Sequence, residues 1–172
     1  MRKTVLKFGL ISAGIFAVVL CAMIPAGECM GFGIGSMIFG YSTMLLSFLT
    51  IFFGVRSYRE NTGGGFISFG RALGVGLLIM LVGCLGYVVT WEIVSHFFLP
   101  DFADAYSAKM MEQMKASGAP QAEIDSQIEM MRLYKENLLF NMAVTLSEPL
   151  PVGLLISLLS ATILRKKKLV AA

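Results

Sequence analysis

The chain has 172 residues, of which 56% are hydrophobic and only 15% are charged, and its formal net charge is +3. Because an ordinary soluble domain carries about 25% charged residues, this composition excludes a water-soluble globule, and nucleic acid is not expected as a partner. The mean hydropathy of +0.76 indicates a chain that folds inside a lipid bilayer. At this length we expect a single membrane domain, residues 1–172, whose helices pack against each other in lipid.

The first apolar run, residues 8–25, follows the basic residues Arg2, Lys3 and Lys7. With roughly 17 apolar residues, it is longer than the core of a secretory signal, which has about 7–15. A lipoprotein-type cleavage before Cys21 needs a small residue just ahead of it, and the chain has Leu20 there. We therefore expect this run to remain as the first membrane-spanning helix.

Two further apolar runs follow, residues 32–55 and residues 70–99, and each is long enough to cross a hydrocarbon slab of about 30 Å. The turn between the first and second runs contains Glu28 and no Lys or Arg. The loop after the second run contains Arg56 and Arg59, and Arg71 follows closely. Since loops rich in Lys and Arg stay in the cytoplasm, we expect this loop on the cytoplasmic side.

The fourth apolar run covers residues 138–164 and ends in the basic sequence RKKK at residues 165–168. Of the 14 Lys and Arg residues, ten lie at the N-terminus, around the loop after the second run, or at the C-terminus. This distribution predicts an all-α, membrane-spanning four-helix bundle with both termini on the cytoplasmic side of a bacterial inner membrane.

A polar segment, residues 101–137, separates the third and fourth runs and is extracytoplasmic in this arrangement. Its apolar residues recur at helical spacing before and after a break at residues 117–120. They are Phe102, Tyr106, Met110 and Met114, then Ile124, Ile128, Met131 and Tyr134. The pattern predicts two amphipathic helices in a hairpin, which we expect to continue the third and fourth spanning helices as a rigid extension. The apolar stripe either packs within the hairpin or binds a partner protein or the bilayer surface.

Four short segments are typical of one bacterial family. They are GVRSYR at residues 54–59, GFISFGRAL at residues 65–73, PDF at residues 100–102, and the Met-rich polar insert before the last run. In these segments, which are spread over nearly the whole chain, the sequence resembles the bacterial domain-of-unknown-function family 4199. The resemblance implies an integral membrane protein with four helices, and it brings no assigned reaction, ligand or functional residue.

Ionisable residues near lipid are the first place to look for function, because each costs about 2.5–3.5 kcal/mol at the centre of a spanning helix. Counted from the basic residues that begin or end their helices, Glu92 lies roughly 31 Å and Glu148 roughly 25 Å across the membrane. Both fall near the outer boundary, as do Glu28 in the outer turn and His96 one helical turn after Glu92. These four residues are either solvated separately among headgroups or form a cluster that binds a cation or relays protons, with Glu148 the deepest.

Glu148 is followed by Pro149 and Pro151, and a proline removes a backbone hydrogen bond from a helix. A kink or a new helix start is therefore expected at this point of the fourth run. Broken helices line substrate pathways in transporters. One candidate function is thus a homo-oligomeric transporter of a small solute, protons or a cation that uses Glu148 and this break.

The glycine-rich segments do not predict a nucleotide site. Residues 31–35 open an apolar run instead of following a strand, and residues 63–65 lack the Lys and Ser or Thr of a phosphate-binding loop. The glycines of the third run are instead expected to let neighbouring helices approach closely. They are Gly70, Gly74, Gly76, Gly83 and Gly86.

Sulfur-containing residues do not predict a metal site either. Cys21, Cys29 and Cys84 have no metal-binding spacing, and a Cys21–Cys29 disulfide would need the chain to turn back between them. The Met pairs at residues 110–111 and 130–131, with Met114 and His96, could in principle bind copper, but the helical spacing of the methionines favours packing. We therefore expect no metal, no cofactor and no enzymatic activity. The expected function is a structural or interaction component that contacts the lipid bilayer and binds a second copy or another membrane protein through the hairpin.

Overall fold

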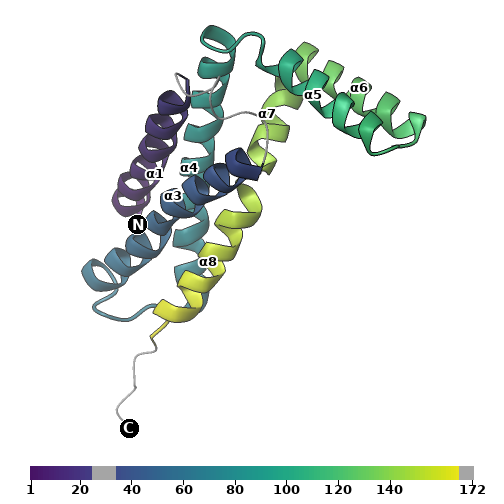
Figure 1. Cartoon of the computed structure of the whole chain (residues 1–172). Helices are drawn as coiled ribbons and strands as arrows, with labels where there is room; N and C mark the ends of the chain where they lie inside the picture. The colour runs from purple at the N-terminus through teal and green to yellow at the C-terminus, as the bar shows by residue number, and fades with distance from the viewer. Residues whose placement is uncertain (25–33, 167–172) are drawn as a thin grey trace.

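The computed structural model describes residues 1–24 and 34–166 of the chain (Figure 1). Its helices are α1 (Arg2–Met23), α3 (Ile34–Asn61), α4 (Phe69–Phe97), α5 (Phe102–Ala116), α6 (Gln121–Glu136), α7 (Leu138–Ser147) and α8 (Leu150–Leu164). The β structure in these residues is a single isolated bridge between Ile67 and Lys166. The all-helical prediction is therefore confirmed for this part of the chain.

Among the described residues, four helical segments are long and apolar enough to cross a membrane. They are Arg2–Ala22, Ile38–Asn61, Phe69–Phe97 and Leu138–Leu164. These segments match the four predicted runs, except that α1 already begins at Arg2, α3 continues past residue 55 to Asn61 and α4 ends at Phe97 instead of residue 99. In the last turns of α3, Arg56 Nε donates to Glu60 Oε1 at 3.1 Å, and such a pair one helical turn apart supports the extension.

Helix α4 lies at the centre of the fold and contacts α1, α3, α7 and α8. Its contact with α1 depends on small residues. A Cβ atom built on Gly86 would lie 2.2 Å from Cβ of Ala13, and one built on Gly83 would lie 2.5 Å from Oγ of Ser12. Because lipid supplies no hydrophobic force between helices, close backbone approach of this kind is what holds spanning helices together.

The five glycines of α4 divide by helix face. A Cβ atom on Gly76 would lie 3.2 Å from Cβ of Ser157 on α8, so the predicted packing role is confirmed for Gly76, Gly83 and Gly86. Gly70 and Gly74 would place a Cβ atom in open space, so the prediction is wrong for these two. They lie one turn apart on a face of α4 that no neighbouring helix covers.

Aromatic rings and one polar contact fill the space between α1, α3 and α4. The rings of Phe16 and Phe48 are buried and meet edge to face, with centroids 5.5 Å apart. Close by, the fully buried hydroxyls of Ser12 and Ser47 lie 2.7 Å apart and form a hydrogen bond. The Ser47 hydroxyl also lies 3.0 Å from the backbone oxygen of Ser12, so polar groups join α1 to α3 inside the apolar core.

The fourth spanning segment is interrupted between α7 and α8, as the prolines predicted. The backbone angles of Glu148 (φ −65°, ψ −53°) and Pro149 (φ −79°, ψ −16°) stay in the right-handed helical region. Since proline has no N–H to donate, the hydrogen-bond ladder stops at Ser147 and begins again when Gly153 N–H donates to the oxygen of Pro149 at 3.0 Å. The result is one segment, long and apolar enough to cross a membrane, that is made of two helices.

Helices α5 and α6 pack against each other as the predicted hairpin. The hairpin projects from one end of the molecule, at an angle to the long axis of the other helices (Figure 1). The expectation that the hairpin extends the third and fourth spanning helices is therefore wrong. Helix α4 ends at Phe97 and a turn containing Pro100 redirects the chain before α5. At the other junction, Asn137 adopts an extended conformation (φ −119°, ψ 102°) between α6 and α7. Two short breaks thus replace the continuous helices that the sequence pattern suggested.

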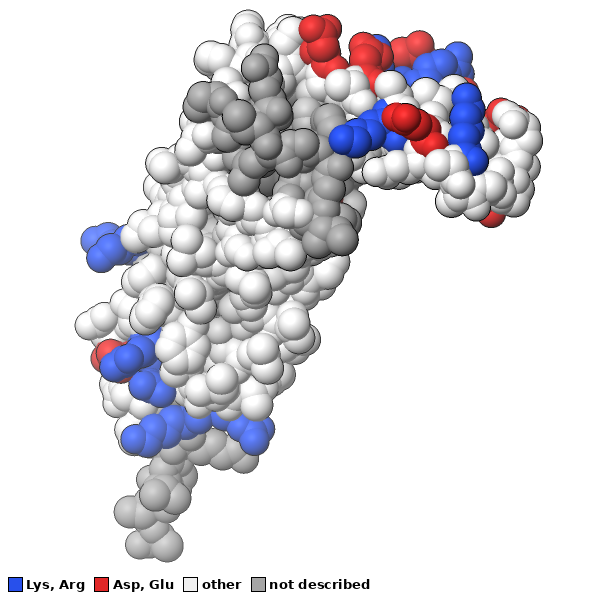
Figure 2. Space-filling view, in the orientation of Figure 1, with Lys and Arg blue, Asp and Glu red and all other residues white. Residues whose placement is uncertain are grey.

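Charged side chains separate along the molecule in Figure 2. Lys and Arg gather where α3 and α8 end and α4 begins, which we call the basic end; it includes Arg56, Arg59, Arg71, Arg165 and Lys166. The hairpin, at the other end, carries charges of both signs. The face between them shows few charges in this view, which fits a band in contact with hydrocarbon.

Candidate functional site

Glu148 lies at the break between α7 and α8 and is tied to α4. The hydroxyl of Tyr87 donates a hydrogen bond of 3.0 Å to Glu148 Oε2. Tyr87 is 9% exposed, and its ring packs against Phe16 of α1 with a centroid distance of 5.0 Å. The carboxylate also precedes the N-terminus of α8, where the helix dipole favours a negative charge. Glu148 therefore connects the interrupted helix to the central helix.

Glu92 and His96 lie one turn apart near the end of α4. Glu92 Oε1 is buried and has no hydrogen-bond partner among the described residues. His96 is its electrostatic neighbour, and the imidazole itself is exposed and meets the Phe97 ring edge to face at 5.0 Å. An unpartnered carboxylate oxygen is costly when buried, so the described residues leave Glu92 Oε1 unsatisfied at this helix end.

Three of the four residues of the predicted outer polar layer, Glu92, His96 and Glu148, are described by the structure. Glu28 lies outside the described residues. Glu92 and His96 share one helix turn, whereas the hydrogen-bond partner of Glu148 is Tyr87. In the part of the chain that is described, no group of three or more His, Cys, Asp and Glu side chains is arranged to hold a metal ion. A shared cation or proton site formed by all four residues stays a prediction.

An aromatic cluster at the base of the hairpin was not predicted as a unit. The indole Nε1 of Trp91 on α4 donates to the hydroxyl of Tyr134 on α6 at 2.9 Å. The Trp91 ring also meets Phe102 of α5 edge to face at 5.1 Å. Asn141 Nδ2 on α7 donates to the backbone oxygen of Tyr134 at 3.3 Å. These contacts join both hairpin helices to the spanning helices, and we call Trp91, Phe102, Tyr134 and Asn141 the base cluster.

A sequence signal for these contacts does exist. Tyr87 and Trp91 are four residues apart, so their polar tips emerge on one face of α4. Buried Tyr and Trp side chains usually find a hydrogen-bond partner. The partners Glu148 and Tyr134 come from later elements. Which partner meets which ring depends on the rotation of each helix about its own axis, and residue spacing does not determine that rotation.

Exposed polar contacts connect the two helices of the hairpin beyond its base. Lys135 Nζ on α6 lies 2.6 Å from Asp104 Oδ1 on α5. The amide of Gln127 donates to the sulfur of Met110 at 3.1 Å. On α6 itself, the hydrogen bond that Arg132 donates to Glu129 Oε1 raises the pKa of the Arg132 guanidinium. Met110 thus has a contact within the hairpin, as the packing prediction expects, whereas Met130 is exposed.

The cysteines give no disulfide in the described residues. Cys21 is a free, exposed cysteine on α1, and Cys84 is free and buried in α4. Cys29 lies outside the described residues, so the question of a Cys21–Cys29 pair stays open.

The fold and the site together define a helical protein with four segments long and apolar enough to cross a membrane. The chain belongs to the family described as "Protein of unknown function (DUF4199)", whose model matches residues 7–166. This match confirms the resemblance drawn from the sequence. A search of curated proteins and a search of solved structures returned no match. Since the family description names no reaction or ligand, the function has to be argued from the residues.

Proposed function

We propose that the protein is a non-catalytic component of the bacterial inner membrane that presents the α5–α6 hairpin on the extracytoplasmic side to another integral membrane protein. The spanning helices form a four-helix bundle in this proposal, and both termini are cytoplasmic. The observation that carries the proposal is the attachment of the hairpin at one end only: its helices contact each other, α7 and Trp91 of α4, and of its described residues only Ile124 is buried.

The hairpin is held in a defined position without being needed to fill the core. The base cluster connects it to α4 and α7. An element that is already ordered binds a partner without a further ordering cost. Exposed apolar side chains accompany the charges on its surface and offer contact area to a partner. They are Tyr106, Ile128, Met130 and Leu133.

Site-specific photo-crosslinking in native membranes tests this proposal. A photoreactive residue replacing Met130, which is 42% exposed, should give one adduct of defined mass, identified by mass spectrometry as a membrane protein or a second copy. The matched position Asp125 points to another face of α6 and should give none. Leu159 on α8, 51% exposed, controls for chance collisions in the bilayer. The absence of an adduct from Met130, or equal adducts from all three positions, would contradict the proposal.

A second candidate function is transport of a proton, cation or small solute by an oligomer. The hydrogen bond between Tyr87 and Glu148 at an interrupted helix favours it, because broken helices with an ionisable residue occur along transport pathways. Glu148 and Tyr87 line neither of the two surface hollows described for the chain, one between α1 and α4 and one at the basic end. The interaction role stays the leading proposal because it follows from the way the base cluster attaches the hairpin.

Flux measurements separate the two functions. Purified protein in proteoliposomes should show no proton or cation flux above that of empty vesicles if the protein is an interaction component. If flux appears and Glu148→Gln abolishes it while Glu129→Gln on the hairpin leaves it intact, the transport function is supported and the non-catalytic interaction role is contradicted.

A further inference from the structure

A hollow of about 510 Å³ opens at the basic end of the molecule, between the loop that joins α3 to α4 and the end of α8. Two cationic side chains line it, Arg71 from the first turn of α4 and Lys166 from the residues after α8. Thr62 and Ser68 add hydroxyl groups, and Phe66 adds an apolar surface. Among the described residues, no acidic side chain lines this hollow.

The walls of the hollow are fixed by backbone contacts. Ile67 N–H donates to the oxygen of Lys166 at 3.1 Å, and Lys166 N–H donates to the oxygen of Ile67 at 2.9 Å. The loop before Ile67 has a shape that only glycine permits, since a Cβ atom on Gly63 would lie 2.2 Å from the oxygen of Phe66. Gly64 and Gly65 follow with φ angles of 59° and 85°. The backbone of the fold thus determines the shape of the hollow.

The charges at this end are unevenly compensated. Glu60 accepts hydrogen bonds from Arg56 at 3.1 Å and from Arg59 at 3.2 Å, so its carboxylate is already occupied. Among the described residues, Arg71 has no ion-pair partner. The ammonium of Lys166 is held 5.8 Å above the ring of Phe66. In the described part of the chain, two cations therefore face this hollow with no anion to balance them.

We propose that this hollow binds the phosphate of an anionic phospholipid headgroup. A guanidinium, an ammonium and hydroxyl donors match the oxygens of a phosphate. The hollow lies where α4 and α8 leave the apolar band, which is the level of lipid headgroups, and Phe66 and Ile67 supply apolar contacts for the rest of the lipid. Inorganic phosphate shares this chemistry, and the experiment below separates the two sources.

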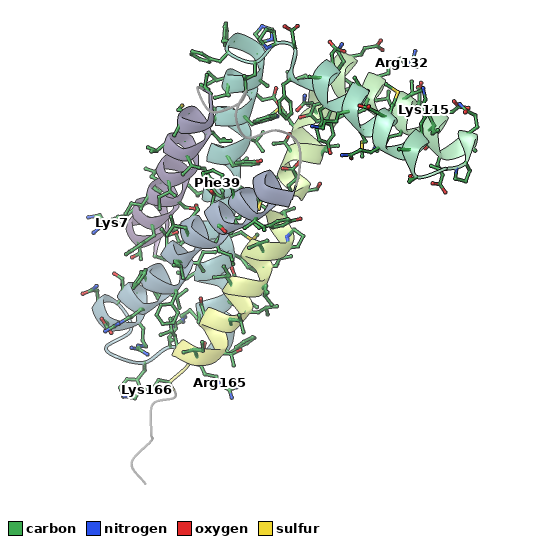
Figure 3. The ribbon with its side chains drawn as sticks, viewed as in Figure 1. Lys7, Phe39, Lys115, Arg132, Arg165 and Lys166 are labelled. Carbon is green, nitrogen blue, oxygen red and sulfur yellow. The ribbon has the colours of Figure 1, made fainter. Side chains whose placement is uncertain are left out.

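The ordinary reason for basic residues at this end is membrane orientation, which requires no binding site. Arg165 makes the distinction possible. It is adjacent to Lys166 and exposed at the same end, yet it does not line the hollow. Figure 3 shows the two side chains leaving the end of α8 in different directions. If the headgroup were attracted only by the overall charge of this end, Arg165 and Lys166 would contribute equally to its binding. A defined site in the hollow predicts that Lys166 contributes and Arg165 does not.

The test measures thermal stabilisation of the purified protein in a neutral detergent with added phosphatidylglycerol, phosphatidylcholine or inorganic phosphate. Phosphatidylglycerol should raise the melting temperature of the wild type, and the other two should not. In the variant Arg71→Gln/Lys166→Gln, the apparent affinity for phosphatidylglycerol should fall about tenfold or more, since each basic residue near an anionic headgroup contributes about 1 kcal/mol. Arg165→Gln should bind as the wild type does. The Ile67–Lys166 bridge uses backbone atoms only, so the variant retains it.

Three outcomes would overturn the proposal. An equal loss in Arg165→Gln would show diffuse electrostatic attraction, and an equal response to phosphatidylcholine would show that the charge of the lipid is irrelevant. Stabilisation by inorganic phosphate alone would assign the hollow to a free anion. The variant Arg71→Lys/Lys166→Arg keeps both charges and should retain most of the affinity, which excludes misfolding as the cause of the loss.

Discussion

The spanning helices and the hairpin of this chain are held together by different interactions. Helices α1, α3 and α4 approach so closely that glycines and serines lie at their contacts, with Gly86 against Ala13 and Ser12 bonded to Ser47. The hairpin has almost no buried core, and the base cluster holds it against the rest of the fold. Packing geometry therefore decides the stability of the first region, as it does for helices in lipid, whereas a few side chains at one end decide the position of the hairpin. Substitutions in the first region should therefore lower the stability of the whole protein, whereas substitutions in the hairpin should change only the hairpin.

The largest effect is expected from a bulky residue at the contact of α1 and α4. Gly86→Leu would force atoms into the space of Ala13, and overpacking of this kind typically costs about 1–3 kcal/mol or more. The melting temperature and the yield of monodisperse protein in detergent should fall sharply. Gly74→Leu is the matched control on the same helix, because a side chain there enters open space. Similar losses in both variants would contradict the close-packing account.

A smaller loss is expected when the buried serine pair is broken. Ser47→Ala removes the hydroxyl that bonds Ser12 at 2.7 Å, and hydrogen bonds between spanning helices contribute about 0.6–2 kcal/mol. Thermal unfolding in detergent measures the change. Ser42→Ala, at an exposed position of α3, should have no effect. A wild-type melting temperature for Ser47→Ala would show that the polar contact is incidental to the packing of α1 on α3.

Substitution in the base cluster should loosen the hairpin and leave the spanning helices unchanged. Trp91→Phe keeps an aromatic ring beside Phe102 but loses the 2.9 Å hydrogen bond to Tyr134, which is typically worth about 0.5–1.5 kcal/mol. Hydrogen exchange should become several-fold faster in α5 and α6, with no change in α1 or α3. Equal acceleration in all helices would mean that the hairpin and the spanning helices unfold as one unit.

The smallest effect is expected at the hairpin surface. Lys135→Ala removes the 2.6 Å contact with Asp104, but both side chains are exposed, and ion pairs in water contribute little. The melting temperature in detergent should stay within experimental error of the wild type. A clear decrease would show that the hairpin depends on this pair more than on its base cluster.

Much of this contrast could be predicted from the sequence, because length and hydropathy determine which segments cross a membrane. The four spans, the hairpin helices and the break after Ser147 were all predicted from runs of apolar residues and prolines. The direction of the hairpin was not, since it depends on the turn at Pro100 and on the single extended residue Asn137. Helical periodicity describes faces within a helix and says little about the angle between consecutive helices.

The candidate site was predicted less completely than the fold. Glu148 was correctly placed at an interrupted helix, but its partner Tyr87 was not identified. Spacing along one helix shows which residues share its face, whereas contacts across helices depend on how each helix is rotated. The packing roles of Gly83 and Gly86 were predicted, and the errors at Gly70 and Gly74 have the same origin: their face of α4 has no neighbour.

The central claim, that the hairpin lies on the opposite side of the membrane from the basic end, is tested most directly by labelling with a membrane-impermeant maleimide. Cys21, Cys29 and Cys84 are first replaced by serine, and a single cysteine is then introduced as Ser117→Cys in the hairpin or Thr62→Cys at the basic end; both positions are exposed. The account predicts that Ser117→Cys reacts in intact spheroplasts and that Thr62→Cys reacts only after permeabilisation. Equal labelling of both positions in intact spheroplasts, or the reverse order, would contradict it.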